Sequence, residues 1–245
     1  MKHIRCRMPR LIWSRMITPA LVARAQLHVR RHFAKNIPAW MVFHDLEHTL
    51  SVVRAAQHIG RASGLSEPAL RTLEIAALFH DVGYAQAYAG HEKKSAAQAA
   101  AFLKTNGVAK RTVEQVRAAI LATRAGQQPR SLMQRVLRDA DSCKIGQVDF
   151  EEKSERLRKE LERVRGRRIQ DEEWLKENLV YVRGHRFHTP YAERRFGRQR
   201  TINQRRLEQR AQLPPKQRTP PTNGEDRFFD RDLSWLAFNA RVLQE

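Results

Sequence analysis

The chain has 245 residues and a formal net charge of +20 at pH 7, a length that suits one well-packed domain with extensions or two small domains. Residues 1–43 and 183–218 carry +9 each, whereas residues 44–182 carry only +4. The sequence contains no apolar run long enough to span a membrane, and two cysteines are too few for a disulfide framework or a zinc finger. This cysteine usage favours a cytoplasmic protein, and the basic flanks would attract a polyanion.

Helical periodicity dominates the rest of the sequence. Apolar residues recur three or four positions apart, and Pro, Gly and capping residues separate the periodic stretches. No stretch combines the alternation of a strand with a hairpin turn. We therefore expect an all-α fold, a multi-helix orthogonal bundle. The expected helices begin near Pro19 and then run over about Asp45 to Ser63, Ser66 toward His80, Glu92 to Thr105, Ala109 to Thr123, Ser131 to Cys143, Phe150 to Val164 and Asp171 to Val182.

One apolar helical stretch, LEIAALFHDVG at residues 73–83, ends in the pair His80-Asp81. A histidine and a carboxylate at adjacent positions can bind one cation from two sides. Two other places offer suitable ligands. One is HDLEH at residues 44–48, where His44 and His48 are four residues apart, and the other is Asp139-Ala140-Asp141, which ends 60 residues after Asp81. Each residue alone is more often a hydrogen-bonded histidine or a helix-capping aspartate. Five chemically suitable residues nevertheless lie at the ends or on the faces of helices that otherwise look like core, where a bound cation would remove the cost of burying unpaired charge.

At these residues the chain resembles the HD superfamily of metal-dependent phosphohydrolases, whose signature is H…HD…D. The phrases that carry the resemblance are HDLEHTLSVV, AALFHDVGY and LRDADSCKIG, and they are similar to one bacterial branch of the superfamily. The resemblance implies a divalent cation, which would be manganese, magnesium, iron or zinc. Its implied ligands are His48, His80, Asp81 and Asp141.

A further histidine, His91, follows Asp81 by ten residues. Dinuclear HD proteins use a histidine in this region for a second metal, so His91 is a second-metal ligand, a phosphate contact or simply the first polar residue of the next helix. The pair is followed by Val82-Gly83 and not by the Glu-Asp of guanosine-tetraphosphate hydrolases. The paired histidines of cyclic di-GMP phosphodiesterases are also missing, so neither activity is favoured.

A hydrolytic mechanism assigns roles to further residues. Asp81 or Glu92 would orient the attacking water or take its proton. His44 would contact the substrate, unless it makes a structural hydrogen bond. Three basic residues near the expected rim would neutralise phosphate oxygens, although each singly is more often ordinary surface charge: Lys93, Lys94 and Arg124.

The C-terminal segment FFDRDLSWLAFNARVLQE resembles the first helix of bacterial polyphosphate kinases. A proline-rich, polar stretch precedes it, as in a linker. The expected organisation is therefore an N-terminal extension at 1–17, an HD domain at 18–200, a Pro/Arg-rich linker at 201–224 and a kinase-like fragment at 225–245.

These features lead to one main functional prediction and two alternatives. The main prediction is a phosphohydrolase that acts on a phosphomonoester, a nucleotide or a phosphoanhydride, with a link to polyphosphate. The alternatives are a non-catalytic HD sensor domain of a polyphosphate kinase fusion and a di-iron HD oxygenase. The expected partners are a small phosphorylated substrate or polyphosphate and a second copy of the chain. Neither a membrane nor a specific nucleic acid is expected, because no recognised binding motif is present.

Overall fold

The computed structural model describes residues 16–213, and these residues form nine α-helices, two short 3₁₀ helices and no β-strand. The expected all-α fold is therefore confirmed for this part of the chain. The elements in order are α1 (Pro19–Asn36), α2 (Leu46–Ala62), α3 (Glu67–Phe79), η1 (Val82–Ala85), α4 (His91–Thr105), α5 (Lys110–Leu121), α6 (Leu132–Ser142), η2 (Cys143–Gly146), α7 (Phe150–Arg165), α8 (Asp171–Gly184) and α9 (Pro190–Gln212). Among these helices, none is both long enough and apolar enough to cross a membrane.

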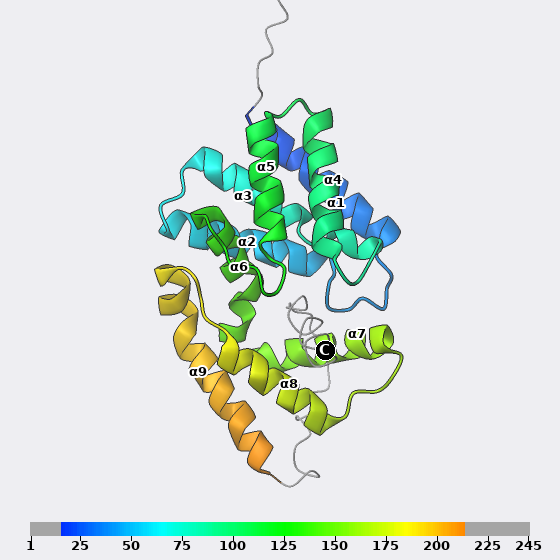
Figure 1. The fold of residues 1–245 in the computed structure, drawn as a ribbon, viewed down its shortest axis with the longest axis vertical. Helices are drawn as coiled ribbons and strands as arrows, with labels where there is room; N and C mark the ends of the chain where they lie inside the picture. Colours follow the sequence, from blue (N-terminus) through cyan, green and yellow to red (C-terminus); the bar gives the residue numbers. More distant parts are fainter. Residues whose placement is uncertain (1–15, 214–245) are drawn as a thin grey trace, which may run out of the picture.

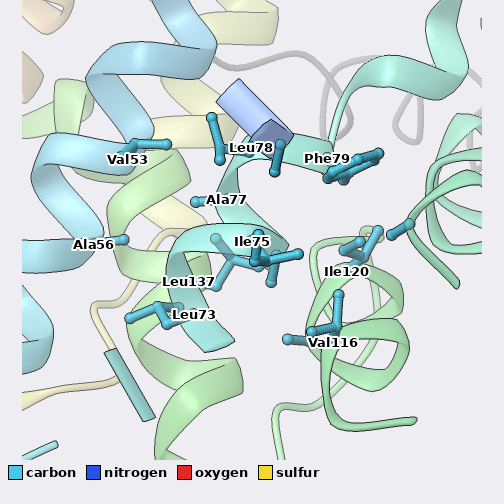
Figure 2. Close-up of a cluster of buried hydrophobic side chains, with 14 of the residues drawn as sticks. Val53, Ala56, Leu73, Ile75, Ala77, Leu78, Phe79, Val116, Ile120 and Leu137 are labelled. Atoms are coloured by element: carbon cyan, nitrogen blue, oxygen red, sulfur yellow. The ribbon is translucent and has the colours of Figure 1, made fainter. Parts of the chain in front are cut away.

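Helix α3 is the central element of the larger hydrophobic core. It contacts α1, α2, α4, α5 and α6, and its side chains are apolar on nearly every side, as expected of a buried helix. Figure 2 shows Ile75 and Leu78 of α3 surrounded by side chains of its neighbours, among them Val53, Ile120 and Leu137. The C-terminal end of α3, where the HD pair follows, is therefore held in the middle of the fold.

The start of α2 is set by Asp45, whose side chain accepts a hydrogen bond from the backbone N–H of His48 at 2.9 Å. This N-cap places the first helical residue at Leu46. His44 therefore lies before the helix, and it does not share a helix face with His48 as the four-residue spacing would allow. The N-cap of α3 is Ser66, as expected, although its side chain makes no capping hydrogen bond.

Helices α7, α8 and α9 form a second layer, which lies below the other helices in Figure 1. Two smaller apolar clusters hold this layer together, one around Leu161 and Trp174 and the other around Leu179 and Leu207. Helix α9 packs against α8 and η2. Because η2 directly follows α6, the second layer is anchored next to Asp141.

The expected linker at 201–224 is wrong in its first half, because α9 continues to Gln212. Leu207 is buried in an apolar cluster, and the side-chain amide of Asn203 donates to the carbonyls of Ile145 and Gln147 at 2.9 and 2.7 Å. These contacts hold the segment in the fold. At the N-terminal end, Ile17, the last residue of the expected extension, is buried in the core. The kinase-like fragment at 225–245 lies outside the described residues.

Candidate metal centre

Four side chains from three helices meet at the centre of the molecule. His48 lies in the first turn of α2, His80 and Asp81 follow α3, and Asp141 lies in the last turn of α6. The first three are at most 4 % exposed, whereas the side chain of Asp141 is 12 % exposed. The centre is therefore buried, and Asp141 is its most accessible member.

The distances within this group leave room for one small ion among four ligand atoms. The Nε2 atoms of His48 and His80 lie 3.0 Å apart, and Asp81 Oδ2 lies 3.1 Å from both of them. Asp141 Oδ1 lies 3.4 Å from Nε2 of His48 and 3.5 Å from Nε2 of His80. The ligand atoms of His48, His80 and Asp141 all lie within 4.8 Å of one another, so these three residues could hold a metal ion.

The hydrogen bonds around the group also suit a cation. The Nδ1–H of His80 donates to the carbonyl of Ala77 at 2.8 Å, which leaves the lone pair of Nε2 directed at the centre in the neutral ring. Within residues 16–213, Asp81 Oδ2 has no partner that satisfies hydrogen-bond geometry. A buried carboxylate oxygen without such a partner is costly, and a cation would compensate it. Two imidazoles and two carboxylates are donors that suit Zn²⁺, Fe²⁺ or Mn²⁺.

The charges of the four residues are strongly coupled in the ion-free protein. Burial favours the neutral form of His80, but the carboxylates of Asp81 and Asp141 outweigh this effect and raise the pKa of His80 well above its usual value. The histidines in turn outweigh burial at the carboxylates and hold the pKa values of Asp81 and Asp141 well below their usual range. The centre thus needs positive charge, which either a proton or a metal ion can supply.

His91 lies on the other side of Asp81. It is the first residue of α4, and its Nε2 is 3.6 Å from Asp81 Oδ1. Its Nδ1 donates to the carbonyl of Tyr88 at 3.1 Å, so Nε2 of the neutral ring presents a lone pair toward the carboxylate. The ring also stacks on Tyr84, with centroids 3.7 Å apart. This placement keeps the second-metal role open.

Glu92 is buried next to His91. Its Oε2 lies 3.9 Å from His91 Nδ1 and, among the described residues, has no hydrogen-bond partner. Glu92 is only 4 % exposed. A buried carboxylate with a free oxygen beside the centre is chemically suited to accept a proton, which is the role predicted for it.

Glu160 of α7 is a residue of this region that the sequence did not indicate. It is fully buried, and its carboxylate accepts hydrogen bonds from the backbone N–H groups of Phe43 and His44 at 2.8 and 3.0 Å. It also accepts from His44 Nδ1 at 2.7 Å and from the Tyr88 hydroxyl at 3.4 Å. The ring of His44 stacks on Tyr84 with centroids 3.9 Å apart. Glu160 therefore fixes two loops beside the centre.

A cavity of about 400 Å³ adjoins the centre, and Asp141 forms part of its wall. The other walls come from the α5–α6 loop (residues 122–131), from α6 and α8, and from the α8–α9 loop (residues 185–189). The charged residues and histidines that line it are Arg138, Asp141, His185, Arg186 and His188.

The predicted phosphate-binding residues do not line this cavity. Lys93 and Lys94 are exposed on α4, and Arg124 is exposed in the α5–α6 loop. The structure places Arg138 and Arg186 there instead. Their positions depend on how α6 and the α8–α9 loop pack, and no local sequence pattern predicts this packing. The substrate-binding role of the three expected residues stays a prediction.

Comparison with known proteins gives one family match, to part of the chain. Residues 45–146 match the family model described as HD domain. The match begins at the N-cap of α2, includes all four residues of the candidate metal centre and ends with η2. No curated protein matches the sequence.

One solved structure resembles the chain, that of a predicted HD superfamily hydrolase from an uncultured Thermotogales bacterium. It is 25 % identical, with a TM-score of 0.49, over 76 % of this chain and 91 % of the other.

Proposed function

We propose that this protein is a metal-dependent phosphohydrolase. The observation that carries the proposal is the convergence of His48, His80, Asp81 and Asp141 on one buried point beside a cavity with basic walls. An ion held by these four residues would supply a Lewis acid that polarises a phosphoryl oxygen and lowers the pKa of a bound water molecule. The HD domain match supports the same assignment.

The residues of the chain perform the remaining tasks. Asp81 turns Oδ2 toward the two imidazoles and Oδ1 toward His91, so Oδ1 can orient a water molecule or take its proton. Glu92 is the second candidate for the proton acceptor, since its Oε2 is buried without a partner in the described part of the chain. Arg138 and Arg186 contribute positive charge to the cavity, where they can neutralise substrate oxygens.

The substrate is a phosphorylated small molecule or polyphosphate. A cavity of about 400 Å³ falls within the size range of ordinary small-molecule sites. A phosphomonoester, a nucleotide and a phosphoanhydride all present the anionic oxygens that such a wall attracts. The link to polyphosphate rests on the resemblance of residues 225–245 to a polyphosphate kinase.

The test combines metal content, activity and stability. The wild-type protein should bind a divalent metal and hydrolyse at least one member of a panel of p-nitrophenyl phosphate, nucleotides, cyclic nucleotides and polyphosphate with manganese, magnesium, zinc or iron. Asp81→Asn should lose both properties. The exposed control Glu114→Gln should keep them.

Added metal should also raise the thermal midpoint of the wild type, since a ligand at about 100 times its Kd stabilises the native state by about 2.7 kcal/mol. It should not raise the midpoint of Asp81→Asn. Equal metal content and turnover in wild type and Asp81→Asn would disprove the proposed function.

A further inference from the structure

The cavity beside Asp141 has a marked imbalance of charge. Among the described residues that line it, Arg138 and Arg186 are cationic, and Asp141 is the only acid. Since Asp141 belongs to the candidate metal centre, its charge is directed at the ion. The lining residues other than Asp141 therefore carry only positive formal charge.

Arg186 differs in its ion pairing from the neighbouring Arg183 and Arg200. Its Nη1 donates to the backbone carbonyls of Arg183 and His185 at 3.0 and 2.8 Å, and within residues 16–213 it forms no ion pair. By contrast, Arg183 pairs with Glu208 at 3.0 Å and Arg200 pairs with Glu193 at 3.3 Å. The guanidinium of Arg186 is exposed and retains donors for an anion.

Two histidines extend the same wall. Burial, with a contribution from Arg200 and other nearby cations, lowers the pKa of His185 to about 3. Burial and the cations Arg138 and Arg135 also lower the pKa of His188. Both rings are therefore neutral and lie in a positive potential. In the described part of the chain, His185 Nδ1 is buried without a hydrogen-bond partner.

The α8–α9 loop that carries these residues is fixed to the helix that carries Asp141. Asp139 is fully buried, and its carboxylate accepts from the backbone N–H of His188 at 2.7 Å. It also accepts from the N–H and the hydroxyl of Thr189 at 2.8 and 2.6 Å. Because Asp139 and Asp141 are two residues apart on α6, the cavity wall and the metal centre are held in one rigid arrangement.

We infer that the cavity binds a second anionic group of the substrate, so that the enzyme acts on compounds with at least two phosphoryl groups. One phosphoryl group would lie at the metal centre, and another would bind Arg186 and its neighbours. A substrate with a single phosphoryl group would leave the charge of Arg186 unused. The inference rests on the proposed function, and it names Arg186 as the residue that selects for the second anion.

The first experiment measures binding without catalysis. The full chain is freed of metal, and its affinity for inorganic tripolyphosphate is measured by calorimetry. Arg186→Gln should weaken binding by about tenfold, as expected for the loss of a charge-assisted hydrogen bond. Arg194→Gln removes the same charge from an exposed position of α9 that does not line the cavity, and its affinity should stay within about twofold of wild type. Equal losses in both variants, or no loss in Arg186→Gln, would overturn the inference.

The second experiment separates this inference from the proposed function. With metal present, Arg186→Gln should lower kcat/KM for tripolyphosphate by about tenfold and leave kcat/KM for p-nitrophenyl phosphate within about twofold of wild type. Failure of the wild type to hydrolyse any phosphate compound would refute the proposed function, while the binding result would stand by itself. Equal effects on both compounds would refute selection by Arg186.

Discussion

Replacing Thr189 by valine should loosen the α8–α9 loop from α6. The hydroxyl of Thr189 donates to Asp139 Oδ2 at 2.6 Å and accepts from the N–H of Ala192 at 3.2 Å as the N-cap of α9. Loss of the cap costs about 1 kcal/mol, and loss of a buried hydrogen bond to a carboxylate costs about 1.5–3 kcal/mol. Because Thr189 is only 2 % exposed, solvent cannot replace either bond. The free energy of unfolding should therefore fall by about 2–4 kcal/mol.

Urea denaturation followed by circular dichroism measures this change. With an m-value of about 2 kcal/mol/M, the midpoint should fall by about 1–2 M while the m-value stays constant. Thr201→Val is the matched control, because Thr201 is exposed on the same helix and its hydroxyl donates only to the carbonyl of Gly197. That control should change stability by less than about 0.5 kcal/mol. Equal midpoints for the two variants would refute the role of Asp139 in holding the loop.

Two further predictions concern the packing beside the metal centre and the response to acid. Gly83→Ala should destabilise the protein by more than about 3 kcal/mol, because a Cβ atom there would lie 2.1 Å from the carbonyl oxygen of His91 and 2.7 Å from the backbone nitrogen of Ser95. A thermal midpoint close to that of wild type would contradict the close approach of η1 to α4. Since burial first and nearby cations second lower the pKa of His185 to about 3, this ring stabilises the native state above pH 6.5, and the stabilisation is lost as the pH falls toward 3. Between pH 7 and pH 5, the free energy of unfolding of the wild type should therefore fall by about 2 kcal/mol more than that of His185→Gln, as measured in urea titrations. An identical fall in both proteins would show that the ring is not buried in its neutral form.

The helices and the HD pair could be predicted because their signals are local. Residues 67–79 are apolar on nearly every helical face, which is typical of a central helix, and His80-Asp81 follows directly. Gly and Pro separate most of the other helices, and α1 to α8 begin and end within a few residues of the expected positions, whereas no helix was expected where α9 lies. The one large error concerns residues 201–212, where a polar, arginine-rich composition suggested a linker.

That error has a clear physical cause. The stability of α9 comes from a few buried residues, such as Asn203 and Leu207, and from the surfaces of α8 and η2 on which they pack. The hydrophobic stripe is too narrow to recognise in the sequence. Tertiary packing therefore overrides the composition of this segment.

The residues of the site also fall into those that the sequence predicted and those that only the structure revealed. The types of the four central residues follow from the sequence, since two histidines and two carboxylates at the ends of apolar helices indicate a cation. Glu160 and Arg186 could not be found in this way, because each acts across more than 40 residues of chain and neither follows a recognisable motif. Glu160, for example, binds His44 from 116 residues away.

Local periodicity was thus enough to predict α1 to α8 and the all-α class, and the resemblance to the HD superfamily selected the four residues that meet at the centre. The packing of α7, α8 and α9 against the other helices established the rest, namely the basic wall beside Asp141 and the loops held by Glu160 and Asp139. The reason is that hydrogen bonds and charge interactions between distant segments form only when the whole chain has folded, and no local pattern in a single sequence predicts them.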